Sequence, residues 1–128
     1  MGAALDVVQQ CYAAFGHQDI PALLKLVADE VDWKVICPAS LPYSGPRRNP
    51  AEVGEFFAAL GQVEPVTAFE PQEFIEAGEN VTVLGYLEAF ALDTNQQFRT
   101  EWVQVFTVRD GKITRWRALT NTAARYGH

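Results

Sequence analysis

Long hydrophobic runs are absent from this chain of 128 residues. No stretch approaches the roughly 20 apolar residues that a membrane-spanning helix needs. The N-terminus has an early Asp6 and lacks the basic segment of a signal peptide. Basic charge is scarce too, since ten Lys and Arg stand against sixteen Asp and Glu, for a net charge of −6. A nucleic-acid-binding domain normally carries a basic stripe, and only Arg47-Arg48 comes near one. We therefore expect neither a membrane nor a nucleic acid as partner.

Cysteine and histidine are also rare, with two of each. Cys11 and Cys37 have no CxxC spacing and no neighbouring histidine, so the pattern indicates neither metal nor redox chemistry. In a chain without a secretion signal, such cysteines are usually buried thiols, which favours a cytoplasmic protein. We expect no metal and no organic cofactor.

The bulk composition is that of a folded domain. Apolar residues make up 48% and charged residues 20%, and 128 residues suffice for one self-sufficient core. No repeat, low-complexity segment or linker divides the chain. We predict a single domain over residues 1–128.

Helical patterns occupy much of the first half of the chain. Leu5, Val8, Tyr12 and Phe15 recur at helical spacing, which predicts an amphipathic helix of about three turns that Gly16 ends. The next two helices are marked by their first residues. Asp19 with Pro21, and Asn49-Pro50 with Glu52, are typical helix starts, and Gly61 is expected to stop the helix that begins at Asn49.

Strand patterns fill the rest. Residues 31–36 alternate like a strand, with Trp33 and Val35 on the same side. Four further strands are predicted at roughly 66–77, 80–91, 97–108 and 112–122, separated by turn residues. Pro71 inside the first of these four implies a bulge or an edge position.

The hairpin from Glu101 to Leu119 is apolar on both faces, so each face needs a covering surface. A three-residue loop at 109–111 with a bulge would place Gln104 opposite Trp116, and Trp102 opposite Ala118. One face then carries Trp102, Gln104, Phe106, Trp116, Ala118 and Thr120. The other face carries Val103, Val105, Ile113, Arg115, Arg117 and Leu119, and its mixture of apolar residues and arginine suits a subunit interface.

The order of these elements resembles the SnoaL-like branch of the nuclear transport factor 2-like superfamily, from about residue 5 to 122. The resemblance is carried by Tyr12-x-x-Phe15 with Asp19, Val31-Asp-Trp33, Tyr43-Ser-Gly-Pro46, Val53-x-x-Phe56-Phe57, Glu101-Trp102 and Asp110-Gly-Lys-Ile113. It implies an α+β fold in which three N-terminal helices wrap a curved antiparallel sheet of about five strands into a cone, the cystatin-like or ketosteroid isomerase-like roll. It also implies a ligand pocket at the mouth of the cone, and a homodimer through the outer sheet face.

The catalytic residues of such folds can be carried onto this chain one by one. The isomerases' tyrosine falls on Tyr12, their base falls at or next to Val35, and their protonated acid falls on Gln104. Epoxide hydrolases of this fold would need acids near Glu88 and at Ala118, and only Glu88 is one. A valine cannot abstract a proton and an amide has no useful pKa, so the isomerase mechanism as it stands is excluded.

Two functions remain. In the first, the chain binds a small apolar or aromatic molecule without an assigned reaction, at the residues Tyr12, Trp33, Val35, Phe56, Trp102, Gln104, Trp116 and Ala118. In the second, it is an isomerase, cyclase or epoxide hydrolase with Tyr12 and Gln104 as hydrogen-bond donors and Glu88 or Glu101 as base. Gln104 is informative in both, because a buried amide without partners costs about 1–3 kcal/mol. Its partner is either a ligand or pocket water, or an internal group such as Tyr12.

Overall fold

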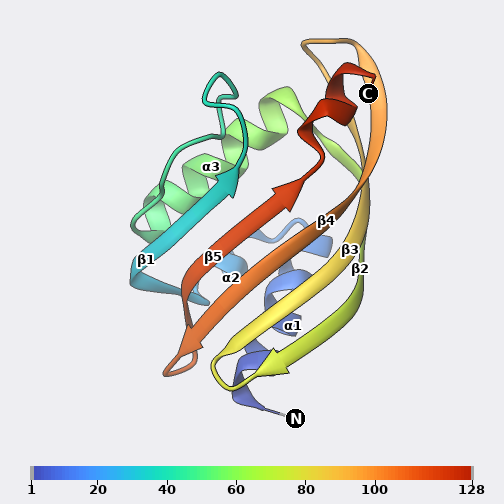
Figure 1. Ribbon diagram of the computed structural model, residues 1–128. Helices are drawn as coiled ribbons and strands as arrows, with labels where there is room; N and C mark the ends of the chain where they lie inside the picture. Colours follow the sequence, from blue (N-terminus) through green and yellow to red (C-terminus); the bar gives the residue numbers. More distant parts are fainter. Residues whose placement is uncertain (1, 128) are drawn as a thin grey trace.

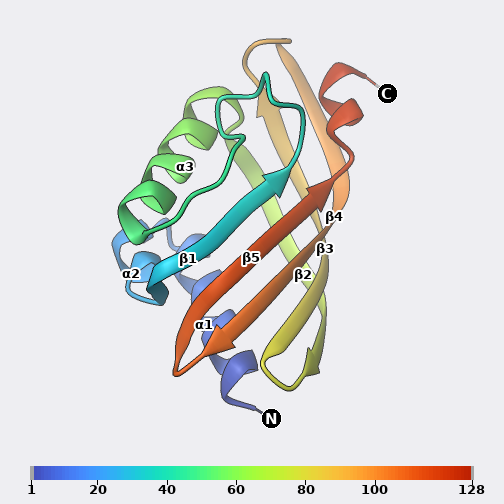
Figure 2. The same cartoon turned by 60° about the vertical axis from the view of Figure 1, so that its left-hand side comes forward.

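The computed structural model describes residues 2–127, in which one curved five-stranded sheet carries three helices on one of its faces (Figures 1 and 2). The helices are α1 (Ala3–Gly16), α2 (Ile20–Leu24) and α3 (Pro50–Val63), and a short 3-10 helix, η1 (Thr122–Tyr126), follows the last strand. The strands are β1 (Val27–Ile36), β2 (Val66–Ala77), β3 (Asn80–Ala91), β4 (Gln96–Arg109) and β5 (Lys112–Thr120). The predicted α+β class is confirmed. No helix in the described residues is both long and apolar enough to cross a membrane.

Both predicted helix caps are present. The Asp19 carboxylate accepts a hydrogen bond from the Ala22 amide, and the Asn49 side chain accepts one from the Glu52 amide at 2.9 Å. These bonds satisfy amide groups that the first turn leaves without a partner. The predicted stop at Gly61 is wrong: α3 continues to Val63, and Glu64 then caps it. Gly61 has space around it and an ordinary helical backbone, so nothing ends the helix there.

The strands lie in the order β1-β5-β4-β3-β2. Neighbours pair antiparallel except β1 and β5, which run parallel, so the predicted wholly antiparallel sheet is wrong at this one pair. The chain leaves β1 at one edge of the sheet and returns through α3 to β2 at the other edge. Three hairpins then bring β5 back beside β1, pointing the same way (Figure 1). The register of β2 shifts between Pro71 and Glu73 on this edge strand, as Pro71 predicts.

The turn between β4 and β5 differs from the prediction. It has two residues, Asp110-Gly111, both with positive φ (52° and 77°), the conformation that matches the twist of a hairpin. A bulge near Thr107 then shifts the register, so that Gln104 lies opposite Ala118 and Phe106 opposite Trp116. The predicted pairs are therefore two residues out of register. A shift of two keeps the side chains beyond the bulge on their own faces, and the predicted inner face is correct.

Ile113 is the one residue of the hairpin predicted on the wrong face. It lies between the turn and the bulge, where it pairs with Val108, and it is fully buried in the core. The inner face of the sheet thus packs against the three helices, while the outer face carries no helix among the described residues (Figure 2). The hydrophobic core therefore lies between the helices and the inner face.

Candidate ligand-binding site

A cavity lies between the inner face of the sheet and the three helices. It offers about 90 Å³ to the centres of water-sized molecules, several times the roughly 10–15 Å³ that one water occupies on this measure. Its wall is mostly aromatic and aliphatic and comes from nearly every element of the fold. The aromatic members are Tyr12, Phe15, Trp33, Tyr43, Phe56, Phe57, Phe69, Phe106 and Trp116. Concave apolar walls with a few polar groups are typical of small-molecule sites.

The structure places seven of the eight predicted ligand-contacting residues on this wall: Tyr12, Trp33, Val35, Phe56, Gln104, Trp116 and Ala118. Trp102 is the exception, because it does not line the cavity. It is buried on the inner face, but its indole lies over Gly85 and stacks on Phe69, with ring centroids 4.8 Å apart. Gly85 has no side chain, and the Trp102 ring fills the space that this leaves.

One side of the cavity is a stacked aromatic pair. The rings of Trp33 on β1 and Trp116 on β5 lie 4.1 Å apart and nearly parallel, because the parallel pairing of the two strands places these residues side by side. Phe56 of α3 meets both rings edge-on. Stacked and edge-on contacts are the preferred geometries of aromatic pairs, so the three rings stabilise one another.

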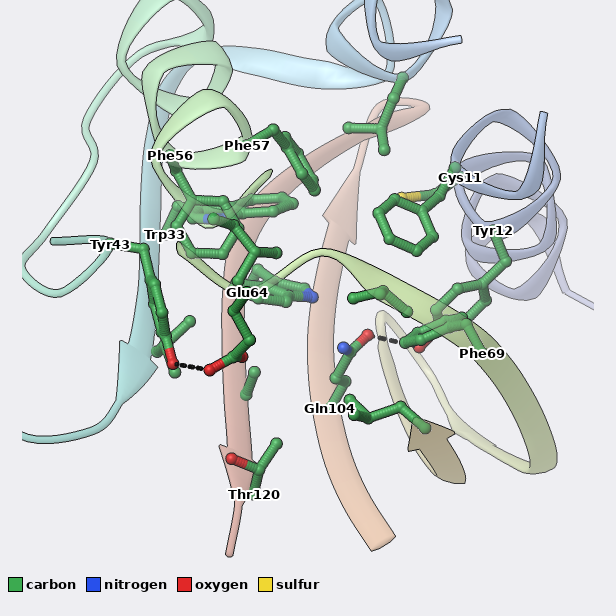
Figure 3. Close-up of a pocket in the computed structure, with 18 of the residues that line it drawn as sticks. Cys11, Tyr12, Trp33, Tyr43, Phe56, Phe57, Glu64, Phe69, Gln104 and Thr120 are labelled. Atoms are coloured by element: carbon green, nitrogen blue, oxygen red, sulfur yellow. Dashed lines mark hydrogen bonds between the residues drawn. The ribbon is translucent and has the colours of Figure 1, made fainter. Parts of the chain in front are cut away.

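Tyr12 and Gln104 form the first polar pair of the site. Burial, together with the neighbouring Cys11, raises the pKa of Tyr12 far above its usual value. The hydroxyl therefore stays protonated and donates to Gln104 Oε1 at 2.8 Å (Figure 3). The sequence left open whether the Gln104 amide binds a ligand or an internal group such as Tyr12, and its oxygen binds Tyr12. Gln104 Nε2 has no hydrogen-bond partner in residues 2–127, and Figure 3 shows it turned away from Tyr12.

The two carboxylates predicted as bases lie outside the cavity. On β3, odd-numbered residues such as Leu87 face the core, so Glu88 points to the outer face, where it accepts a hydrogen bond from the Tyr86 hydroxyl at 2.9 Å. Glu101 is exposed and pairs across the strands with Tyr86. The assignment of Glu88 or Glu101 as base is therefore wrong, because the alternation of the strands sends both to the other side of the sheet.

A different carboxylate, Glu64, lies on the cavity wall. It caps α3 and is largely buried, and its Oε1 accepts hydrogen bonds from the Tyr43 hydroxyl (2.9 Å) and from Nε of Arg125 (Figure 3). Oε2 has no partner in the described part of the chain, and it is not among the fully enclosed unpaired atoms. Burial, and then the Glu64 charge, raise the pKa of Tyr43, which therefore remains a donor.

Arg125 links this pair to the surface. Its side chain is only 1% exposed, and its guanidinium binds Asp93 with two hydrogen bonds of 2.8 and 3.2 Å. None of the site residues predicted from the sequence belongs to this network. The one local signal is an acidic residue, Glu64, directly after the apolar stripe of α3, and nothing in the sequence connects it with an arginine 61 residues away.

The polar groups of the cavity are held in place by the hydrogen bonds of the Tyr12–Gln104 pair and of the Tyr43–Glu64–Arg125 network. Burial raises the pKa of the Cys11 thiol to about 12, so it stays a neutral thiol at the cavity wall. Among residues 2–127, no three His, Cys, Asp or Glu side chains are grouped so that they could hold a metal ion. What remains is an aromatic chamber with two hydrogen-bonding pairs.

The fold and this chamber define a class of proteins. The chain belongs to the SnoaL-like domain family, whose model matches residues 8–116. The predicted resemblance to SnoaL-like and nuclear transport factor 2-like proteins is thereby confirmed. No curated protein matches the chain.

Several solved structures share the fold over nearly the whole chain. A nuclear transport factor 2-like protein from Burkholderia xenovorans LB400 is 29% identical, with a TM-score of 0.84, over 98% of this chain and 94% of that one. A nuclear transport factor 2-like protein from Burkholderia thailandensis E264 is 24% identical, with a TM-score of 0.88, over 99% and 97%. TerC, co-crystallised with polyporic acid, is 28% identical, with a TM-score of 0.87, over 98% and 97%.

Proposed function

We propose that this protein binds a small cyclic or aromatic molecule in the chamber, with the curved sheet and its helices enclosing the ligand as a cone. The observation that carries the proposal is the amide nitrogen of Gln104 on a mostly apolar wall, where it has no hydrogen-bond partner among residues 2–127. This nitrogen is not among the fully enclosed unpaired atoms, so a ligand oxygen in the chamber can accept its hydrogen bond. The similarity to TerC, which was crystallised with polyporic acid, supports a ligand of this kind.

A ligand screen read by thermal shift tests the proposal, with polyporic acid and a panel of aromatic ketones and phenols as probes. A ligand at about 100 times its Kd should add about 2.7 kcal/mol to the free energy of unfolding. Gln104→Leu should weaken binding about tenfold, because the ligand loses its donor. Gln97→Leu, on the same strand but exposed, is the matched control and should bind normally. Equal shifts in native protein and Gln104→Leu would remove Gln104 from the site.

Binding is supported better than catalysis. The catalytic alternative needs a base, and among residues 2–127 the carboxylate on the wall is that of Glu64. Its Oε1 already accepts from Tyr43 and Arg125, which makes Glu64 an oriented hydrogen-bond acceptor. The polar groups thus favour recognition of a ligand over transfer of its protons.

We also propose that the outer sheet face forms a homodimer. Ile36, Leu119, Val103 and Leu84 are neighbours in one row across four strands, and Ile36 and Leu119 are 47% and 45% exposed. A row of apolar side chains open to water favours burial against a second copy.

Sedimentation equilibrium tests the dimer. Native protein should sediment at twice its chain mass, and Leu119→Glu should sediment as a monomer, because a charge at the centre of the interface would be buried unpaired. Glu55→Lys, exposed on α3 and therefore on the helical side of the sheet, should leave the dimer intact. A native protein that is monomeric at micromolar concentration would rule the proposal out.

A further inference from the structure

We propose that the ligand is an aromatic carbonyl compound that also carries a neutral hydroxyl group, and that this hydroxyl donates to Glu64 Oε2. The inference rests on the proposed function and narrows its ligand class. It assigns the Tyr43–Glu64–Arg125 cluster as a second recognition point, on the other side of the chamber from Tyr12 and Gln104 (Figure 3).

The two recognition points have opposite hydrogen-bonding character. At Gln104, the oxygen is taken by the Tyr12 hydroxyl, which leaves the amide nitrogen as a donor. At Glu64, one oxygen is taken by two donors, which leaves Oε2 as an acceptor that the cavity reaches. A ligand that satisfies both must therefore present an acceptor to Gln104 and a donor to Glu64. The aromatic wall of the chamber, which includes the stacked Trp33 and Trp116, favours an aromatic body for the ligand.

The charge balance selects the donor. Arg125 binds both Glu64 and Asp93, so its one positive charge is shared between two carboxylates. An anionic ligand would bring its charge against the open oxygen of Glu64, and a cationic ligand would have to leave water for a mostly apolar chamber. A neutral hydroxyl fits best, since its bond to a carboxylate is stronger than a bond between neutral groups. A carbonyl oxygen is the matching acceptor at the other side, where the Gln104 amide can donate.

Four matched probes separate the contacts on the native protein. Para-hydroxybenzophenone has both the carbonyl and the hydroxyl group, and benzophenone has the carbonyl alone. Para-methoxybenzophenone has the carbonyl and a blocked hydroxyl, and para-benzylphenol has the hydroxyl alone. In isothermal titration, para-hydroxybenzophenone should bind about tenfold or more tightly than each of the other three, because each lacks one charge-assisted or amide hydrogen bond. This comparison needs no variant.

Glu64→Gln then tests the acceptor itself. The variant keeps the side-chain shape but presents an amide nitrogen in place of Oε2, so the methoxy probe should bind about as tightly as the hydroxy probe. Glu55→Gln, exposed on the same helix, is the matched control and should keep the native preference. A circular dichroism spectrum like that of the native protein checks that the variant is folded.

The outcomes distinguish this inference from the proposed function. If the four probes bind native protein equally, the hydroxyl contact is wrong while a binding chamber remains. The same holds if the hydroxyl preference persists in Glu64→Gln. If none of the four binds although the wider thermal-shift screen finds a ligand, the inference fails and the proposed function stands; if that screen finds no ligand either, both fail. If Glu64→Gln does not fold, the native comparison alone decides.

Discussion

Tyr12 and Gln104 depend on each other for their hydrogen bonds. Removing the Tyr12 hydroxyl leaves the Gln104 oxygen without a partner, so Tyr12→Phe should lower the free energy of unfolding at pH 7 by about 1 kcal/mol. Urea unfolding at neutral pH measures this loss. A variant as stable as the native protein would show that the hydroxyl contributes nothing.

The same tyrosine makes stability depend on pH. Its pKa is raised in the folded state, so the unfolded chain releases this proton first, above about pH 10. The unfolded state is thereby favoured, and the free energy of unfolding falls as the pH rises past that value. Tyr12→Phe should show a shallower fall in urea midpoints from about pH 9 to 11. Parallel curves for the two proteins would contradict a raised pKa at Tyr12.

For single residues, the sequence predicts some members of the site and misses others. Tyr12, Trp33 and Gln104 could be placed on the cavity wall because helix and strand periodicity decides which way a side chain faces. The direction of the Glu88 side chain could not be predicted, because an error of one residue in the position of a strand exchanges its two faces. Glu64 lies where α3 ends, and periodicity says nothing about a capping residue.

The packing of β3 against β4 depends on Gly85, whose backbone lies in close contact with the Trp102 ring. A Cβ there would lie 2.2 Å from Trp102 Cζ2 and 2.6 Å from the backbone oxygen of Glu70. The Trp102 ring could move, but the backbone oxygen belongs to the paired strand β2 and cannot rotate away. Gly85→Ala should therefore lower the free energy of unfolding by about 3 kcal/mol, the upper end of the usual cost of overpacking.

Gly61→Ala is the matched control. It lies in α3 with nothing within 4 Å of its would-be Cβ, and alanine should stabilise the helix by about 0.5–1 kcal/mol. Urea unfolding of both variants measures the difference. Similar stabilities would mean that the contact between Trp102 and Gly85 is loosely packed.

The elements also show where local sequence suffices. The caps at Asp19 and Asn49 were predictable because a cap is made by residues a few positions apart. The bulge near Thr107 was not, because a bulge is defined by pairing with β5 and neither strand shows it alone. The inner face of the β4–β5 hairpin was still predicted correctly, because the predicted and observed registers differ by an even number of residues.

For the whole molecule, the decisive contacts join distant parts of the chain. The parallel pairing of β1 with β5 and the binding of Arg125 to Glu64 and Asp93 both close the fold after the last hairpin. Sequence periodicity reports neither, since it describes one segment at a time. The α+β class could be predicted because it depends on the order of elements alone.

Arg125 offers a test of this closure. It ties η1 to the end of α3 and to the β3–β4 connection, and it is buried. Arg125→Leu leaves the Glu64 charge buried with the Tyr43 hydroxyl as its remaining partner, so the free energy of unfolding should fall by about 3–5 kcal/mol. Replacing Glu64 as well, in Glu64→Met with Arg125→Leu, should recover part of that loss because no unpaired charge remains.

Arg109 is the matched control for a surface ion pair. It binds Glu79 at 3.1 Å with both side chains more than half exposed, so Arg109→Leu should cost less than about 1 kcal/mol. Urea unfolding of the three variants compares the two arginines directly. If Arg125→Leu were as mild as Arg109→Leu, the Arg125 network would not hold the C-terminal segment against α3. If the double variant were less stable than Arg125→Leu, the loss would come from packing around Arg125 rather than from an unpaired carboxylate.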